Sequence, residues 1–172
     1  MWGGNHIAAL LGSSACWLVW DKRCGVVPEM SYADCEIAYT SFDKPARVFR
    51  FVWSGFIQQN MGAAKEERVH PTQKPVPLFK WCLERYSKPE DIILDPFSGS
   101  GTTALACHAL NRRFICIERE HKYVEISRNR LRDAQAQMDL FRSAKTESAE
   151  AQNTGTQHGQ QEIAEVLAEG EL

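Results

Sequence analysis

A glycine-rich turn is the part of this sequence whose residue types and spacing could do chemistry. Residues 99–104 read Gly-Ser-Gly-Thr-Thr-Ala and match the pattern Gly-x-Gly-x-x-Ala. Glycines let the backbone turn sharply, and they let a ligand approach where a Cβ atom would collide. Glu118 follows Gly101 by 17 residues, and a carboxylate at the end of a strand can accept hydrogen bonds from both hydroxyls of a ribose. The pattern predicts a site for a ligand that contains adenosine; a turn that serves only strand–helix packing is the alternative.

Asp95, just before the turn, narrows the choice of ligand. No Lys-Ser or Lys-Thr pair follows the glycines, which excludes a P-loop for a triphosphate. An acidic side chain at this place would repel a pyrophosphate, so it disfavours a nicotinamide cofactor but leaves it formally open. It would suit a ligand that carries positive charge, such as S-adenosylmethionine with its sulfonium and ammonium groups. A helix cap, or a hydrogen-bond acceptor for its own loop, is the other role open to Asp95.

The segments around the turn predict the elements that must position it. Residues 91–95 are typical of a strand, residues 102–110 of an apolar helix and residues 114–118 of a second strand. A strand, turn, helix and strand within about 30 residues predict a βαβ unit with two parallel strands. A long helix is predicted over residues 121–138.

Upstream of this unit the pattern predicts more strands and one more helix. Residues 16–20 form a continuous apolar run, which is typical of a strand buried on both faces. Residues 36–42 and 47–53 are rich in β-formers and are interpreted as an antiparallel hairpin. Residues 54–69 are interpreted as a loop. An amphipathic helix follows Pro77, and its buried stripe is predicted to consist of Leu78, Phe79, Cys82, Leu83 and Tyr86.

Charge is divided unequally along the 172 residues, whose formal net charge is −2. Residues 143–172 hold one Lys and six Glu, a net of −5, whereas residues 1–142 hold 19 Lys and Arg against 16 Asp and Glu, a net of +3. We therefore predict a mildly basic folded domain over residues 1–142 and an acidic, disordered tail over residues 143–172. A hydrophobic content of 44% excludes a wholly disordered chain.

Cysteine and hydropathy patterns indicate the compartment. The six cysteines form no Cys-x-x-Cys pair and the five histidines no His-x-x-x-His, so we expect no metal site. No apolar run approaches about 18 residues, and the N-terminus does not resemble a secretory signal. These features predict a reducing, cytoplasmic location without a membrane partner.

Two motifs together resemble the cofactor motifs of the DNA amino-methyltransferases. They are residues 95–103, Asp-Pro-Phe-Ser-Gly-Ser-Gly-Thr-Thr, and residues 70–75, His-Pro-Thr-Gln-Lys-Pro. In the permuted beta subgroup of this family the catalytic half comes before the cofactor half. There the His-Pro-Thr-Gln-Lys-Pro motif lies just before the glycine turn, as residues 70–75 do here. The resemblance extends over about residues 2–135. It implies an α/β, Rossmann-like methyltransferase fold with a mostly parallel sheet, an antiparallel hairpin and circularly permuted motifs.

The resemblance also implies roles for individual residues in binding S-adenosylmethionine. Glu118 would hold the ribose hydroxyls, and Thr72 and Lys74 would contact the amino-acid end. An ammonium group at Lys74 can pair with a carboxylate, which agrees with the chemistry of that end. For His70 a purely structural role stays open. The residues implied to line the methionine and ribose end are Asp95, Phe97, Gly99, Gly101 and Thr102.

The family's catalytic motif is missing from this sequence. That motif is an Asp, Asn or Ser followed by Pro-Pro and an aromatic residue; it accepts hydrogen bonds from the target amino group and stacks on the flipped base. The sequence has no Pro-Pro pair, and its one Asp-Pro pair is Asp95-Pro96. We assign no catalytic residue, although Asp21 at a strand end is a weak substitute. We expect a family member that is truncated at the N-terminus and lacks its first strand, or the product of a split or decayed gene.

The predicted function is transfer of a methyl group from S-adenosylmethionine to the exocyclic amino group of a flipped base in double-stranded DNA, with adenine favoured over cytosine. The alternative is an inactive or split cofactor-binding fragment; a nicotinamide-dependent enzyme is a third. A complementing N-terminal fragment or a second copy is the expected protein partner. The setting would be restriction-modification in a bacterium or a phage-infected cell. Four basic residues could meet DNA phosphates, although a solvated charged face explains them equally well: Arg47, Arg50, Lys65 and Arg68.

Overall fold

The computed structural model describes residues 1–28, 33–54, 57–62 and 65–140. The chain divides into two compact units, Met1–Ser127 and Arg128–Leu172. Residues 121–127 of the first unit and residues 128–140 of the second are helical, which confirms the helix predicted over residues 121–138. The predicted acidic tail lies outside the described residues, and the predicted domain boundary after residue 142 stays a prediction.

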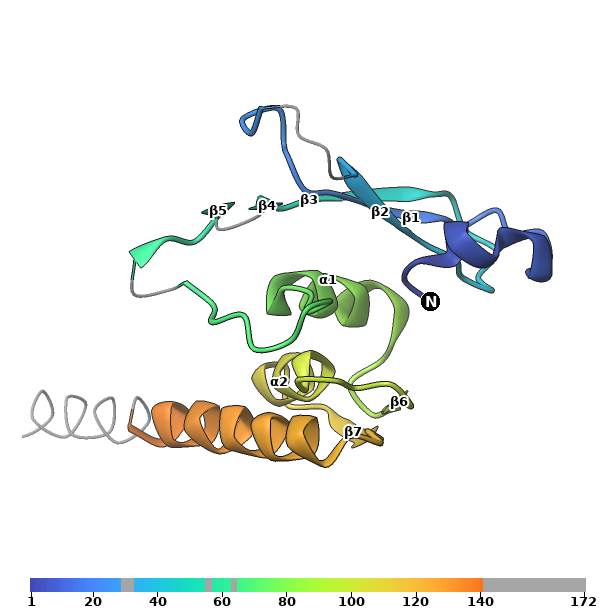
Figure 1. Cartoon of the computed structure of the whole chain (residues 1–172). Coiled ribbons are helices and arrows are strands. Elements are labelled where there is room, and N and C mark those ends of the chain that lie inside the picture. The colour runs from blue at the N-terminus through green and yellow to red at the C-terminus, as the bar shows by residue number, and fades with distance from the viewer. Residues whose placement is uncertain (29–32, 55–56, 63–64, 141–172) are drawn as a thin grey trace, which may run out of the picture. The chain divides into compact units, whose positions relative to one another are not determined.

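The first strands form the three-stranded sheet that Figure 1 shows nearly edge-on at the top, and β1 (Leu18–Asp21) is its middle strand. Strand β2 (Cys35–Ala38) pairs with β1 antiparallel, and β3 (Arg47–Arg50) pairs with it parallel on the other edge. The predicted hairpin between residues 36–42 and 47–53 is therefore wrong, because β1 lies between its two strands. Alternating side chains tell which face of a strand is buried, but they do not tell which strand is its neighbour.

A short antiparallel pair follows, β4 (Trp53–Ser54) and β5 (Ile57–Gln58). The prediction of a loop over residues 54–69 missed this pair. The Gln58 side chain is buried and holds the next segment, since its amide donates to the Glu66 carbonyl at 2.8 Å and accepts from the Glu66 N–H at 3.0 Å. A two-residue strand is too short for its alternation to be recognised in the sequence.

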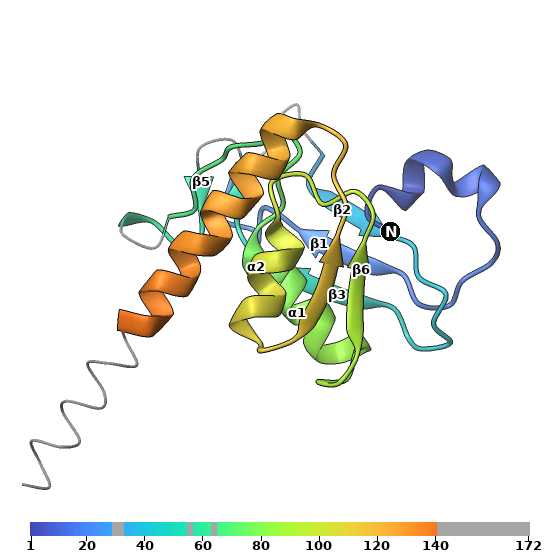
Figure 2. The same cartoon turned by 90° about the horizontal axis from the view of Figure 1, so that it is seen from below.

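The predicted βαβ unit is confirmed. Strand β6 (Ile92–Asp95), helix α2 (Thr102–Ala109) and strand β7 (Arg113–Cys116) follow one another, and the two strands pair parallel. Figure 2 shows β6 and β7 side by side and pointing the same way. Before them comes α1 (Val76–Tyr86), whose N-cap is Pro75 and whose first turn contains Pro77, in agreement with the preference of proline for first helical turns.

Helix α1 lies between the three-stranded sheet and α2 (Figure 1). Toward the sheet, Leu78 packs in one cluster with Trp20. Toward α2, Leu83 packs with Ala106 and Cys107. Burying one leucine side chain contributes about 1.5–3 kcal/mol. Because α1 buries apolar side chains on both of these faces, it joins the sheet to α2, which begins at the glycine turn.

The strands of the described residues form three separate ladders, β2-β1-β3, β4-β5 and β6-β7. The α/β class is confirmed. One face of β6-β7 is covered by helices, whereas the other carries exposed apolar side chains. The exposed side chains on this open face and their exposed fractions are Ile92 at 52%, Leu94 at 61%, Ile115 at 53% and Ile117 at 53%.

Within the described part of the chain, no helix is long and apolar enough to cross a bilayer.

Candidate functional site

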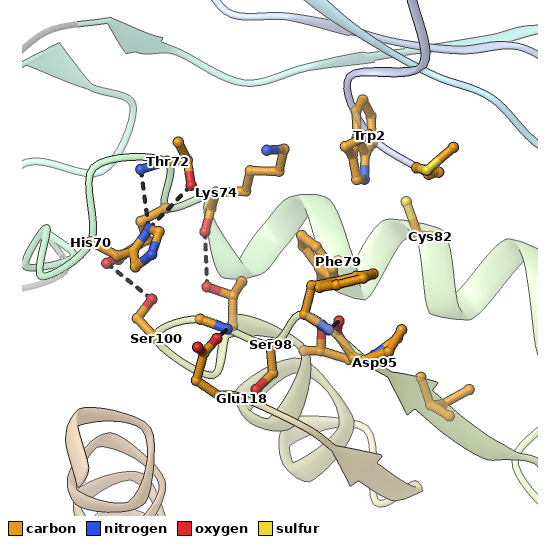
Figure 3. A pocket seen from close by; sticks show the side chains of 18 of the residues that line it. Trp2, His70, Thr72, Lys74, Phe79, Cys82, Asp95, Ser98, Ser100 and Glu118 are labelled. Atoms are coloured by element: carbon orange, nitrogen blue, oxygen red, sulfur yellow. Dashed lines mark hydrogen bonds between the residues drawn. The ribbon is translucent and has the colours of Figure 1, made fainter. Parts of the chain in front are cut away.

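A cleft of about 740 Å³ opens over the glycine turn. Its walls are the turn after β6, the loop of residues 70–74, one side of α1 and the N-terminal residues (Figure 3). Trp2 and Phe79 give it an apolar wall, and Asp95 and Glu118 give it two carboxylates. All of these residues belong to the unit Met1–Ser127, and we call this space the first cleft.

Two glycines make the turn at the bottom of the first cleft. Gly99 has φ 51° and Gly101 has φ 80°, both in the left-handed region that side chains with a Cβ seldom adopt. A Cβ on Gly101 would lie 2.8 Å from the Cβ of Ser127, so the helix that contains Ser127 needs a glycine here. The Gly101 N–H donates to the Ser98 carbonyl at 2.8 Å, which closes the turn directly before α2.

Asp95 ends β6, and its carboxylate faces the turn (Figure 3). The N–H of Phe97 donates to Oδ1 at 3.0 Å, and the Thr103 hydroxyl donates to Oδ2. Asp95 therefore fulfils the loop-bonding role that the sequence left open. It also lines the first cleft, and since each carboxylate oxygen accepts more than one hydrogen bond, the same group can still meet a ligand donor.

Glu118 follows β7, and its carboxylate is held by backbone groups on both sides. Oε1 accepts from the Glu120 N–H at 2.9 Å, and Oε2 accepts from the Gly99 N–H at 2.8 Å. These donors, with that of Glu120 the stronger, hold the pKa of the Glu118 carboxyl below its ordinary value. An ionised carboxylate thus lies fixed beside the glycine turn, where it can accept hydrogen bonds from hydroxyl groups.

The loop of residues 70–74 is tied to the glycine turn by two side chains of the turn. The Thr102 hydroxyl donates to the Lys74 carbonyl at 3.1 Å, and the Ser100 hydroxyl donates to Oε1 of Gln73 at 3.3 Å (Figure 3). Ser100 and Thr102 are buried. The two sequence motifs, about 25 residues apart in the chain, therefore form one structure.

Gln73 holds this loop in shape from within, and the sequence analysis did not single it out. Its side chain is only 8% exposed. Oε1 also accepts from the Val69 N–H at 3.0 Å, and Nε2 donates to the Glu67 carbonyl at 2.9 Å. A buried amide with these partners makes the loop rigid, because each lost partner would leave a desolvated polar group. Its place inside the His-Pro-Thr-Gln-Lys-Pro motif was the available signal.

His70 has a structural surrounding. Its ring lies 4.3 Å from that of Tyr123, and its Nδ1 lies 3.1 Å from the Thr72 hydroxyl oxygen. Nδ1 also accepts from the Thr72 N–H at 3.2 Å. These contacts support the structural role that the sequence left open, although the ring also lines the first cleft.

The structure brings most of the predicted cofactor residues together. Gly101 forms the turn without lining the first cleft. Phe97 stands at the edge of the cleft and is 89% exposed. The predicted residues that line the first cleft are Thr72, Lys74, Asp95, Phe97, Gly99, Thr102 and Glu118.

The apolar wall of the first cleft was missed as a site feature. Phe79, Cys82 and Leu83 were interpreted only as the buried stripe of α1, yet part of that stripe faces the cleft. Burial raises the pKa of the Cys82 thiol to about 12, so this thiol is an apolar wall group and not a nucleophile. The part played by Trp2 could not be predicted, because it depends on the long-range antiparallel bridge between Trp2 and Ala38.

The four predicted DNA-contacting residues are not brought together. Arg68 lines a second cleft of about 560 Å³ beside the first. Arg47, Arg50 and Lys65 line neither of these two clefts. All four are exposed, so a solvated surface accounts for three of them.

Asp21, the weak substitute for a catalytic residue, stabilises a turn. Its Oδ1 accepts from the backbone N–H groups of Arg23 at 3.0 Å and Cys24 at 2.8 Å, and Oδ2 lies 3.8 Å from the Arg50 guanidinium. It lines neither cleft. These contacts favour the interpretation of Asp21 as a strand-end residue.

Taken together, the site is a cleft for a small ligand at the carboxyl ends of parallel strands in an α/β domain, with two carboxylates and a glycine turn. The family follows from the sequence comparison: the model described as DNA methylase matches residues 28–129. The chain belongs to this family, which confirms the resemblance.

Individual relatives are similar over parts of their length. The type II methyltransferase M.HinfI of Haemophilus influenzae is 42% identical over 87 residues, which are 49% of this chain and 24% of that protein. The type II methyltransferase M2.MboI of Moraxella bovis is 32% identical over 117 residues, which are 68% of this chain and 41% of that protein. The chain thus spans between a quarter and two fifths of these relatives. The crystal structure of the M1.HpyAVI–SAM complex matches with 30% identity and a TM-score of 0.48, covering 67% of this chain and 60% of that one.

Proposed function

We propose that the first cleft binds S-adenosylmethionine and that the chain serves methyl transfer to the exocyclic amino group of a DNA base, adenine being favoured over cytosine. The observation that carries this proposal is the pair of carboxylates at the ends of neighbouring strands. Glu118 suits the ribose hydroxyls, Asp95 suits the ammonium group, and Lys74 on the opposite loop suits the carboxylate. The apolar wall at Phe79 suits the uncharged parts of S-adenosylmethionine.

The cofactor would supply a methyl group made electrophilic by a sulfonium centre. The residues of this chain bind and orient that cofactor: the turn fixes its ribose end and the loop of residues 70–74 its amino-acid end. No residue among the described ones is assigned to the target base. The catalytic Asp-Pro-Pro-aromatic pattern, or its Asn or Ser variant, does not occur in the 172 residues.

The active unit therefore includes, in our proposal, a complementing polypeptide segment that carries the catalytic motif. The open face of β6-β7 supports this idea, because Leu94 pairs beside Ile115 and both are more than half exposed. Apolar side chains gathered on one face mark a contact surface more often than a solvated one. The names of the relatives favour a role in bacterial restriction-modification, and hence in the cytoplasm.

The alternative, an inactive or split cofactor-binding fragment, is favoured by one observation, the absence of the Pro-Pro motif. A methylation assay separates the two. We expect the 172-residue chain alone to bind S-adenosylhomocysteine but to transfer no tritiated methyl group to DNA. Addition of a polypeptide with the family's catalytic motif should restore transfer. Cofactor binding without restored transfer by any such polypeptide would favour the inactive fragment.

A thermal melt tests the need for a partner. With an uncovered apolar face, the isolated chain should be marginally stable, and its melting temperature should rise with protein concentration or with the added partner. A sharp, concentration-independent melt of a monomer would contradict this expectation.

A further inference from the structure

The second cleft lies beside the first, and the two share walls. Trp2 and the loop residues Thr72, Gln73 and Lys74 line both. The other walls of the second cleft come from the end of β1, from β2, from β4 and from the loop before residue 70. A ligand in the second cleft would therefore touch the same loop that borders the cofactor.

The charges in the second cleft do not balance. Glu36 of β2 is the shared partner of two lysines, with Lys22 Nζ at 3.6 Å from Oε1 and Lys74 Nζ at 3.3 Å from Oε2. The lysine side chains are only 16% and 21% exposed. One carboxylate cannot neutralise two ammonium groups, and in partly buried surroundings the excess positive charge is screened less than at an open surface.

Arg68 adds a second positive charge, held in a fixed place. Its guanidinium lies 4.4 Å from the ring centre of Trp53, which is itself only 6% exposed. Among the described residues, no carboxylate forms a salt bridge with Arg68. Contact with the indole restrains the guanidinium at the wall of the second cleft, and a guanidinium has several N–H donors that can bind a phosphate in a bidentate way.

We propose that Lys22 and Arg68 bind a backbone phosphate of the DNA strand whose base is presented to the first cleft. The inference rests on the proposed function, since it needs DNA as the substrate. The shared loop is the reason for choosing DNA over a free anion: a strand bound through its phosphate in the second cleft has its neighbouring nucleotide beside the cofactor. Lys74, between the two clefts, links phosphate binding to the cofactor site.

The test is the salt dependence of DNA binding by the full 172-residue chain. The probe is a short fluorescein-labelled duplex, and the binding constant is measured over a range of KCl concentrations. The variants Lys22→Gln and Arg68→Gln should each reduce the slope of log K against log [KCl] by about 0.9, the value for one lost phosphate contact. Both should weaken binding several-fold at low salt.

Two control variants remove the same charges away from both clefts, and Arg85, like Arg68, lies against an indole. Arg85 lies 5.3 Å from the ring centre of Trp81, and Lys44 lies 5.8 Å from that of Phe42. The variants Arg85→Gln and Lys44→Gln should leave the slope unchanged. Equal losses in all four variants would overturn the proposal in favour of diffuse surface charge.

A variant that is expected to bind DNA more tightly keeps the test decisive if Lys22→Gln or Arg68→Gln fails to fold. Glu36→Gln removes the one carboxylate between the two lysines, so it should tighten DNA binding several-fold. Unchanged or weaker binding by this variant would overturn the proposal. Absence of duplex binding by the wild-type chain would also overturn the proposal. Titration with S-adenosylhomocysteine then shows separately whether the first cleft binds the cofactor, as the proposed function requires.

Discussion

The two clefts share one loop but are built by different means. In the first cleft the carboxylates of Asp95 and Glu118 are held by N–H and hydroxyl donors of the turn, of the first residues of α2 and of Glu120. In the second, Glu36 and its two lysines are held by ion pairs between long side chains. Backbone donors fix a group with little loss of side-chain entropy, whereas lysine ion pairs rearrange readily.

This difference matches two kinds of ligand. A rigid cleft with fixed acceptors suits a small cofactor of one shape, because preorganised groups cost little to order on binding. A cleft of rearranging charges suits a polyanion, whose affinity comes from phosphate contacts and falls with salt. The four variants described next each change a residue that forms or supports the first cleft.

The largest effect is expected at Gly101. Gly101→Ala places a Cβ at φ 80° and against Ser127, so it should destabilise the fold by about 2–5 kcal/mol, the sum of left-handed strain and overpacking. Gly25→Ala is the matched control, since Gly25 has φ 71° but no atom within 4 Å of the new Cβ. It should cost about 1–2 kcal/mol from strain alone. Urea unfolding measures both; equal losses would show that the approach of Ser127 is unimportant.

The next effect is expected at Gln73. Gln73→Leu removes an amide that bonds to the Val69 N–H, the Glu67 carbonyl and the Ser100 hydroxyl. The loss should be about 1–3 kcal/mol of stability, with weaker S-adenosylhomocysteine binding. Gln59→Leu, which removes one bond from an exposed amide, should change stability by less than about 1 kcal/mol. If calorimetry finds that Gln73→Leu binds S-adenosylhomocysteine as tightly as the wild type, then this amide does not hold the loop of residues 70–74 in shape for the cofactor.

A smaller effect on stability, but a specific effect on binding, is expected at Asp95. Asp95→Asn keeps one acceptor oxygen but removes the charge, so S-adenosylhomocysteine should bind about tenfold more weakly, the range for a lost charged partner. Asp21→Asn, which lies outside both clefts, should bind it like the wild type. The reverse order would remove the cofactor role of Asp95.

The smallest effect is a pH dependence from Glu118. Because the pKa of this carboxyl is lowered in the folded state, its contribution to stability is present above its ordinary value of 4.5 and is lost as the pH falls through the lower, folded value. Glu118→Gln should therefore flatten the acid side of a stability-against-pH curve measured by urea unfolding. An acid limb as steep as that of the wild type would contradict the role of the backbone donors.

Local features of the fold could be predicted from the sequence, and long-range ones could not. Strands β6 and β7 and helix α2 lie within two residues of their predicted bounds, since apolar periodicity and the glycines are local signals. The hairpin was wrong because nothing in the pattern of β2 or β3 shows that β1 lies between them. A pattern reports the face of a strand, and its neighbours depend on the whole chain.

The site shows the same division. The turn residues Asp95, Gly99 and Thr102 were predictable because they lie close together in the chain, within a motif that resembles the cofactor motif of the DNA amino-methyltransferases. Gln73 was not singled out, since its place in the His-Pro-Thr-Gln-Lys-Pro motif is its one signal in the sequence, and its partners are defined only once the fold buries it. Lys22, and the ion pairs that join it to Lys74 through Glu36, were missed for a related reason: the two lysines are 52 positions apart, and the pairing of β1 with β2 brings Glu36 between them.

The most direct test of the account is a calorimetric titration of the 172-residue chain with S-adenosylhomocysteine and, separately, with NAD. The carboxylates of Asp95 and Glu118 predict saturable binding of S-adenosylhomocysteine, weakened by Asp95→Asn; because Asp95 would repel a pyrophosphate, they also predict no binding of NAD. A folded chain that binds NAD alone, or that binds neither ligand, would contradict the account.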